Sequence, residues 1–256
     1  MNKNLLRPCL LGFALISSSL LAETLTIRSD RWYPINGDPN DTAPGYMIEI
    51  AKEILTPKNI TVDYQISPWA RAIVKAKQGR IDCIVGAYKS DVPNFLFPEL
   101  AWGMDQNFFY VKEDNPWRYT NFDSLLNTKI GLIHKYSYTK ELERFAKEAK
   151  NKAIFDYTFG ENALKQNIAK VLAGRLTATI ESYLVMPEKL SLLGLENKLI
   201  PAGSIGEPTP MYIACSPKKE SSKVYVKWFD EGLTTLRENG RLNAILAKYG
   251  LSDWVK

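Results

Sequence analysis

The order of strand-forming and helix-forming segments is the feature that most constrains this fold. Apolar residues alternate over 24–28 and Ile60–Ile66, the period of a half-buried strand, and 81–86 is a short apolar strand. Between them, apolar residues recur at helical spacing in Tyr46–Leu55 and in 68–79. Strands that alternate with helices predict a parallel sheet with right-handed crossovers.

The same order returns in the second half of the chain. The strands and helices expected there are Ile130–Ile133, Lys140–Ala149, a strand within Ala153–Phe159, Glu161–Ala173, Leu176–Ile180, Pro187–Leu193 and a final helical stretch over 223–249 that breaks at Gly240. The second half therefore repeats the architecture of the first, and we expect an α/β protein built from two such units.

Two segments are interpreted as connections between these units. The strand Asn107–Val111 leads into the polar stretch Lys112–Asn115. The turn-rich segment 201–210, with three Pro and two Gly, precedes the strand Met211–Cys215. The first segment would carry the chain into the second unit, and the other would return it.

Residues 1–22 have the composition of a secretory signal peptide. Two basic residues and no acidic one accompany an apolar stretch, and the small residue Ala22 precedes the expected cut. A membrane anchor is the weaker interpretation, because Ser17–Ser19 interrupts the apolar run and a spanning helix needs about 20 predominantly apolar residues. We therefore expect an exported, periplasmic protein that begins at Glu23.

Charge and composition argue against several classes of function. The formal net charge is +5, and without residues 1–22 the chain keeps 31 basic and 28 acidic residues, a net charge of +3. No Lys/Arg block is concentrated enough to indicate nucleic-acid binding. The chain has one His, and Cys83 and Cys215 are the cysteines left after cleavage, so we expect no metal site and no cofactor.

Five segments carry a family resemblance. They are Gly45–Ile54, Trp69–Ile73 with Gly79–Gly86, Lys129–Ile133, Leu172–Ala178 and Gly240–Gly250. Together, and in this order over roughly residues 24–250, they resemble the bacterial extracellular solute-binding proteins of family 3.

The resemblance implies a type II periplasmic-binding fold, in which two α/β lobes are joined by a two-segment hinge. Lobe one would comprise 23–111 plus 211–256, and lobe two 113–208. It also implies a monomer that captures an amino acid or related small polar solute between the lobes. The partner would be an ABC permease or a membrane receptor, and ligand contacts with both lobes would drive closure.

In lobe one, the resemblance places candidate ligand contacts after the first strand and at the start of the second helix. Trp32 stands where the family has an aromatic side chain that packs on the ligand, with Tyr33 as its alternative and Asp30 orienting the loop. Trp69 and Arg71 open the second helix. The alternatives are a Trp32 that covers lobe one and an Arg71 in a surface ion pair.

The segment after the third strand departs from the family's pattern. The positions that offer backbone N–H and hydroxyl groups to an anionic ligand group are here Gly86, Ala87, Tyr88 and Ser90. The family's carboxylate-binding Arg is absent from 88–94, so a bidentate guanidinium clamp from this segment is not expected. Arg71 or Lys89 would then supply the charge.

In lobe two, Tyr136 and Ser137 stand where the family has a small-residue turn at a helix N-terminus, which attracts anions. The family's ammonium-binding acid corresponds to Ser182, and Glu181 precedes it. Glu181 reaches the cleft if the strand has ended there; otherwise it is a surface carboxylate on the opposite face. The aromatic content favours an aromatic, cyclic or cationic solute at least as much as a plain amino acid.

Two other functions fit the same sequence. Some proteins that resemble this fold are dehydratases of cyclic acids, and Glu181 would be their general acid here if burial raised its pKa. The sequence has no nucleophile–base pair, metal cluster or phosphate loop to support other chemistry, so we expect a binding protein and not an enzyme. The second is a ligand sensor for a membrane receptor.

The two remaining cysteines lie in apolar, strand-like runs. If the strand order follows the family, Cys83 and Cys215 stand on neighbouring strands of lobe one. A disulfide needs a Cα separation below about 7 Å and suitable Cβ directions. A buried free thiol is also ordinary, and we expect two free cysteines.

Overall fold

The structure is a computed structural model that describes residues 23–255, so the predicted signal peptide lies outside the described residues. The strands and helices, in chain order, are β1 (Glu23–Ser29), α1 (Tyr46–Leu55), β2 (Ile60–Ile66), α2 (Trp69–Lys77), β3 (Cys83–Ala87), β4 (Gly103–Lys112), β5 (Ile130–Ile133), α3 (Lys140–Lys147), β6 (Phe155–Thr158), α4 (Ala163–Leu172), β7 (Ala178–Ser182), α5 (Val185–Leu192), β8 (Leu199–Cys215), α6 (Ser221–Glu238) and α7 (Arg241–Ala247).

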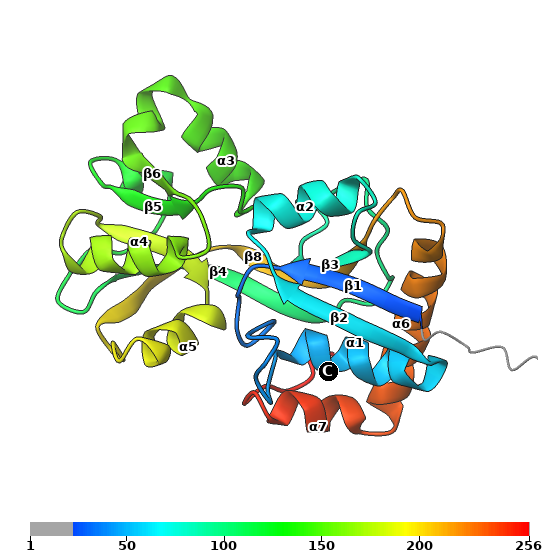
Figure 1. Cartoon of the computed structure of the whole chain (residues 1–256). Helices are drawn as coiled ribbons and strands as arrows, with labels where there is room; N and C mark the ends of the chain where they lie inside the picture. The colour runs from blue at the N-terminus through cyan, green and yellow to red at the C-terminus, as the bar shows by residue number, and fades with distance from the viewer. Residues whose placement is uncertain (1–22, 256) are drawn as a thin grey trace, which may run out of the picture.

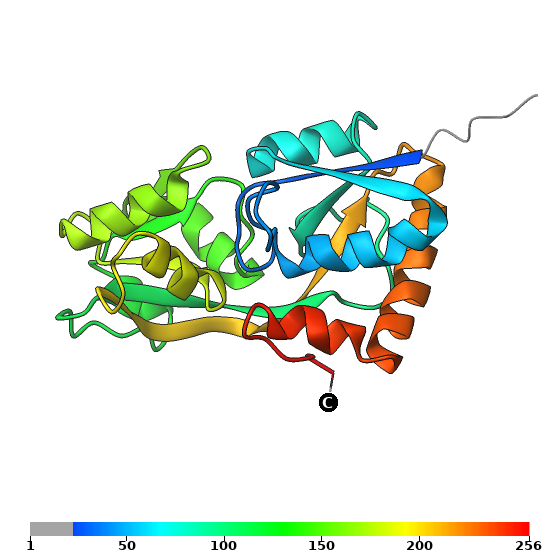
Figure 2. The same cartoon turned by 60° about the horizontal axis from the view of Figure 1, so that its bottom comes forward.

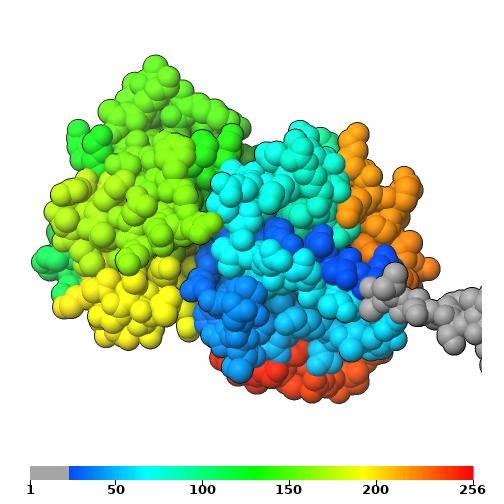
Figure 3. Space-filling view, viewed as in Figure 1, coloured from blue at the N-terminus to red at the C-terminus, as the bar shows by residue number. Residues whose placement is uncertain are grey.

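Within the described residues, the eight strands form one sheet in the order β2-β1-β3-β8-β4-β7-β5-β6. β1 pairs in parallel with β2 and β3, and β5 pairs in parallel with β6 and β7. The predicted parallel pairing is therefore confirmed in both halves of the molecule. Helices flank the sheet in each half, and the space-filling view shows the two halves in contact along their boundary (Figures 1 and 3).

The strongest sequence patterns give the right boundaries. α1, β2 and β5 begin and end where the apolar periodicity predicts. The inward positions of α1, spaced as one helical face, are fully or almost fully buried: Met47, Ile50, Ala51 and Ile54. α1 thus buries an apolar stripe against the sheet, and Pro57 lies just beyond its end.

β8 is much longer than the sequence predicts. The turn-rich segment 201–210 is part of a strand that runs from Leu199 to Cys215. Pro201 pairs with Tyr110 of β4, and Pro210 pairs with Met104. A proline lacks the N–H of a regular ladder, but strands accept it at edges and bulges, and the β4–β8 pairing has register shifts. The prolines therefore do not end this strand.

β4 and β8 carry the chain between the two halves, side by side (Figures 1 and 2). Their pairing extends from Gly103–Met211 at one end to Lys112–Leu199 at the other. The predicted crossing at Lys112–Asn115 is instead a turn beyond the end of β4, closed by the Asn115 N–H on the Lys112 carbonyl at 2.9 Å. The reason is that Phe109 and Val111 are already buried in the second half's core.

Each half has its own large hydrophobic cluster. In the first, Trp102 packs edge-on against Phe229 of α6, with ring centroids 5.1 Å apart. In the second, Phe109 stacks on Tyr119 with centroids 4.4 Å apart. No helix within residues 23–255 combines the length and the apolar character that crossing a membrane requires.

Cys83 and Cys215 form a disulfide, so the expectation of two free cysteines is wrong. The two residues stand directly opposite each other in the antiparallel register of β3 and β8, with Cα atoms 4.0 Å apart. Directly opposed residues of an antiparallel pair project to the same face, which brings the two sulfurs together. Both residues are fully buried.

Candidate functional site

The loop after β1 folds back on itself and presents Trp32 to the second half. The Trp32 N–H donates to the Asn36 carbonyl at 2.8 Å, and the Asn36 side-chain amide donates to the Asp30 carbonyl. The same amide donates to the Tyr64 hydroxyl at 3.1 Å, which ties the loop to β2. The loop is therefore held in place by its own hydrogen bonds, and its Trp32 side chain is only 8% exposed.

The Trp32 ring lies on the backbone of β3 at Gly86. Gly86 has a φ of +74°, and a Cβ there would lie 3.1 Å from Cε3 of Trp32. Tyr88 and Tyr136 meet the indole edge-on, each with its ring centroid 6.4 Å away. Tyr88 follows β3 in the first half and Tyr136 follows β5 in the second. The three rings form an aromatic cluster across the boundary.

Glu181 of β7 is the polar partner of Trp32. The indole N–H donates to Oε1 of Glu181 at 2.8 Å, and the Ser182 N–H donates to the same oxygen at 2.9 Å. Oε2 is buried and has no hydrogen-bond partner among the described residues. Burial raises the pKa of Glu181 to about 8, against the lowering effect of the two hydrogen bonds. At neutral pH this side chain is therefore mostly protonated.

Asp105 of β4 forms a second buried polar group at the boundary. Its Oδ2 accepts from the Tyr88 hydroxyl and its Oδ1 from the Ser182 hydroxyl, both at 2.5 Å. Burial raises the pKa of Asp105 above its ordinary value, although both hydroxyls lower it. Ser182 and Tyr88 are thus held by Asp105, and their hydroxyls are already used in this network.

Asp30 and Asp91 complete a set of carboxyl groups with raised pKa. The Tyr136 hydroxyl donates to Oδ2 of Asp30, a further bond between the halves. Burial raises the pKa of Asp30 to about 6, against that bond. Burial likewise raises the pKa of Asp91 to about 6, against the lowering effects of the Ser137 side chain and of the Tyr88 N–H, which donates to its Oδ2 at 2.8 Å.

Most of the predicted site residues surround a very small cavity, of about 20 Å³. Its lining is Ser29, Asp30, Trp32, Trp69, Val85, Gly86, Tyr88, Asp91, Asn107, Tyr136 and Ser137. A cavity of this size holds about one water molecule. Aromatic rings therefore fill the place where the family resemblance puts the ligand.

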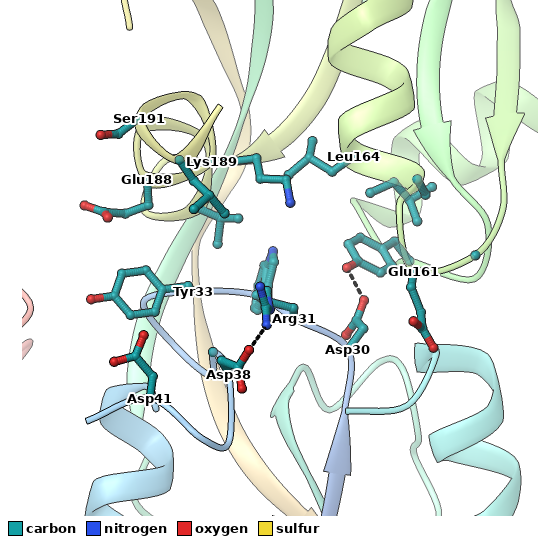
Figure 4. A pocket seen from close by; sticks show the side chains of 18 residues that line it. Asp30, Arg31, Tyr33, Asp38, Asp41, Glu161, Leu164, Glu188, Lys189 and Ser191 are labelled. Carbon is teal, nitrogen blue, oxygen red and sulfur yellow. Dashed lines mark hydrogen bonds and ion pairs between the residues drawn. The ribbon is translucent and has the colours of Figure 1, made fainter. Parts of the chain in front are cut away.

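A much larger cavity, of about 330 Å³, adjoins it and shares Asp30, Trp32 and Tyr136 with it; Figure 4 shows the large cavity. The first half contributes Asp30, Arg31, Trp32, Tyr33, Gly37, Asp38 and Asp41, and the second contributes Ile133, Tyr136, Gly160, Glu161, Ala163, Leu164, Val185, Glu188, Lys189, Ser191 and Leu192. Pockets for small ligands typically have about 300–1,000 Å³. This cavity is therefore large enough for a small solute.

The large cavity is rich in carboxyl groups. Five acidic residues and two basic ones line it, and Arg31 forms an ion pair with Asp38 (Figure 4). Lys189 comes from α5 of the second half. Within residues 23–255, no group of three or more His, Cys, Asp or Glu side chains is arranged to hold a metal ion.

The sequence matches the family model of bacterial extracellular solute-binding proteins, family 3, over residues 25–252. The chain belongs to this family. The match confirms the resemblance carried by the five sequence motifs. A comparison with curated proteins gives no match.

Solved structures similar to this family member share its fold. One, from work on glutathione import through GshT and the cystine ABC importer TcyBC of Streptococcus mutans, has a TM-score of 0.74 at 20% identity and covers 91% of this chain and 98% of its own. An ancestral arginine-binding protein bound to arginine has a TM-score of 0.71 at 17% identity, with 88% and 97% covered. A histidine kinase sensor domain with similarity to periplasmic binding proteins has a TM-score of 0.71 at 19% identity, and the match covers 88% of this chain and 95% of that domain's chain. The type II periplasmic-binding fold is therefore confirmed.

The structure brings most predicted site residues of this family member together. Asp30, Trp32, Tyr33 and Tyr136 line the large cavity, and Trp69, Gly86, Tyr88 and Ser137 line the small one. Ala87, Glu181 and Ser182 are buried close by and line neither cavity. Glu181 still belongs to strand β7, yet it is not a surface carboxylate, because Trp32 covers it.

Two predicted contacts lie apart from the others. Arg71 and Ser90 are exposed and line neither cavity. Arg71 is two positions after the buried Trp69 on α2, and residues so spaced face different sides of a helix. Lys89 is also exposed, and its ammonium lies 4.7 Å from the ring centroid of Tyr212. Neither Arg71 nor Lys89 therefore brings positive charge to the cavities.

Sequence reasoning missed several residues of the site. Asp105 lies in the part of β4 that precedes the predicted strand, so its inward direction was not expected. Lys189 and Glu188 belong to a helix that was expected, but nothing in a short helix with weak amphipathic character shows which face meets the other half. Asp41 sits in the loop after β1, where acidic residues are common.

Proposed function

We propose that this protein is a periplasmic solute-binding protein, which captures a small polar solute between its two lobes and delivers it to an ABC transporter. The solute is an amino acid or a related compound. The observation that carries the proposal is the cavity of about 330 Å³, whose walls come from both halves of the molecule. A solute held from both sides stabilises the closed arrangement relative to the open one.

The division into lobes is part of this proposal. Lobe one comprises 23–111 plus 211–256, and lobe two 113–208, with one adjustment from the packing. We put the crossing in β4 near Asp105, where the β4–β8 register shifts, because Phe109 and Val111 are buried in the second core. Each lobe then has its own core, and the protein acts as a monomer.

A thermal-shift screen tests the proposal. Purified protein without its signal peptide is heated with single amino acids, short peptides, amines and small carboxylic acids. A true ligand raises the melting temperature in proportion to the logarithm of its concentration above the dissociation constant. Isothermal titration then gives the stoichiometry, which should be one per chain. If no compound class raises the melting temperature, solute binding is rejected.

A ligand sensor is the second candidate, and the similarity to a histidine kinase sensor domain favours it. Uptake of the solute found by the screen separates the two roles. Deleting the gene should abolish high-affinity uptake if the protein serves a transporter. Normal uptake together with a lost transcriptional response to the solute would assign it to a sensor instead.

Catalysis at Glu181 is the third candidate, because a pKa of about 8 suits a general acid. Glu181 borders neither cavity, however, and its Oε1 is occupied by Trp32 and Ser182. Mass spectrometry of cyclic acids incubated with the protein should therefore show unchanged compounds. Turnover that is lost in Glu181→Gln would replace the binding proposal with an enzymatic one.

A further inference from the structure

Charged groups are distributed unevenly around the large cavity. Lys189 and Arg31 extend toward its middle, whereas Asp41 and Glu188 stand near the Tyr33 ring (Figure 4). The electrostatic neighbours agree with this view. Burial raises the pKa of Tyr33, and the next contributions come from Glu188 and Asp41. The cavity therefore has a cationic part and an anionic part.

The cationic part is centred on Lys189. Within the described residues its ammonium has no hydrogen-bond or ion-pair partner, although the side chain is half-buried. Burial lowers the pKa of Lys189, and the cations Arg31 and Lys165 lower it further, more than Glu181 raises it. A partly desolvated ammonium beside other cations is stabilised by an anion. This part of the cavity thus favours a carboxylate.

The anionic part surrounds Tyr33. Its ring lies between Asp41 and Glu188, and a cation placed over an aromatic face gains from the ring quadrupole as well as from nearby carboxylates (Figure 4). Arg31 is not available to neutralise this part, because it pairs with Asp38. An ammonium or guanidinium group is therefore favoured there.

We infer that the large cavity holds a dipolar solute, with its carboxylate bound by Lys189 and a cationic group over Tyr33 between Asp41 and Glu188. The inference rests on the proposed function and adds the solute class. Since the lining has five acidic residues against two basic ones, solutes with more cationic groups than carboxylates bind best. A lysine on α5 of the second half takes the carboxylate in place of the missing arginine after β3.

Matched pairs of probes test the role of the carboxylate. Titration calorimetry compares L-arginine with agmatine and L-lysine with cadaverine, which are the same solutes without the carboxylate, and adds L-glutamate. We expect each amino acid to bind about tenfold or more tightly than its amine, since a charge-assisted bond is lost. L-glutamate should bind weakest. Equal affinities within both pairs would overturn the inference.

Substitutions at Lys189 test which residue makes that bond. Lys189→Ala should weaken the binding of L-arginine about tenfold or more and leave the binding of agmatine unchanged or tighter. The difference in affinity between L-arginine and agmatine should then disappear. Lys189→Arg should keep most of the affinity. Arg71→Ala is the matched control, because it removes one positive charge from an exposed position outside the cavity. An unchanged pair difference in Lys189→Ala contradicts the assignment.

Substitutions in the anionic part of the large cavity separate this inference from the proposed function. Asp41→Asn and Glu188→Gln should each weaken L-arginine and agmatine by a similar factor, because both carry the cationic group. If another solute from the screen binds with an affinity that none of these variants changes, the solute-binding function stands. The assignment of the solute to these residues of the large cavity is then wrong. If no probe and no screened solute binds, both fail.

Discussion

The indole N–H of Trp32 donates a hydrogen bond to Oε1 of Glu181 at 2.8 Å, and this bond links the loop after β1 to β7 across the boundary between the halves. Trp32 also lines both cavities. Trp32 therefore borders both cavities and also links the halves, as the bond from Tyr136 to Asp30 does. The contact of Trp32 with Glu181 therefore bears on the arrangement of the halves and on the walls of both cavities.

Replacing Trp32 by Phe should loosen this link. The variant removes the N–H and leaves a buried carboxyl oxygen of Glu181 with the Ser182 N–H alone. We expect the free energy of unfolding to fall by about 1–3 kcal/mol beyond the loss of ring volume. Urea unfolding measures the change. Small-angle scattering should also report a larger radius of gyration.

Trp102→Phe is the matched control for that variant. Trp102 is fully buried, and its indole N–H has no hydrogen-bond partner among the described residues. The control therefore loses the same ring volume without losing a hydrogen bond. Equal destabilisation in the two variants would mean that the bond to Glu181 contributes nothing measurable.

The stability of the protein should fall as the pH rises from about 4.5 to about 8. Glu181 has a folded pKa of about 8 against an ordinary 4.5, so the folded state binds more protons than the unfolded state between these values. Asp30 and Asp91, with pKa raised from 3.8 to about 6, add to the effect at the lower end. Each group contributes a slope of up to about 1.4 kcal/mol per pH unit.

Glu181→Gln isolates one part of this dependence. The amide keeps an acceptor for Trp32 and does not titrate, so the variant should lose most of the slope between pH 6 and 8 and keep the lower part from Asp30 and Asp91. Urea unfolding at several pH values between 5 and 8.5 provides the data. A wild-type protein that is equally stable at both ends of this interval would refute the raised carboxyl pKa values.

Gly86→Ala should destabilise the protein more than Gly174→Ala. Both positions have positive φ, +74° and +69°, so both variants bear a similar backbone cost of about 1–2 kcal/mol. Only at Gly86 does the added Cβ meet a neighbour, 3.1 Å from Trp32, whereas Gly174 has open space. Thermal unfolding compares the two, and the solute affinity should drop only in Gly86→Ala. A larger loss of stability in Gly174→Ala would contradict the close contact between Trp32 and Gly86.

Removing the disulfide should lower the free energy of unfolding by roughly 2–4 kcal/mol. Cys83 and Cys215 are 132 residues apart in the sequence, and the bond between them restricts the unfolded chain. Urea unfolding of Cys83→Ala/Cys215→Ala is compared with the wild type, with and without reductant. Reductant should weaken the wild type toward the variant and leave the variant unchanged. A wild type that does not respond to reductant in urea would show that no bond is present.

The sequence predicts this fold well where one physical signal is dominant. α1 and β2 have uninterrupted apolar periodicity, and their ends agree with the structure. β8 could not be found in the same way, because its prolines are tolerated only through the particular register with β4, which is a tertiary property. The disulfide depends on a Cα distance that composition does not contain.

The site could likewise be predicted only where it depends on local sequence signals. Trp32 and Tyr88 lie together because they follow the ends of β1 and β3, which are parallel, and strand ends of a parallel pair share an edge. Tyr136 follows β5 in the other half and meets Trp32 across the boundary. The sequence does not show that these rings fill their own space and leave the larger cavity beside them. Lys189 faces that cavity because of how α5 sits on the second half, which local periodicity cannot give.

The continuous pairing of β4 with β8 has a mechanical consequence. Two chain segments that are paired from Gly103–Met211 to Lys112–Leu199 act as one two-stranded ribbon. The regular ladder is locally disrupted at the register shifts between Asp105 and Asn107 and between Phe108 and Tyr110. If the two halves open, we therefore expect them to move by bending of this ribbon at the register shifts.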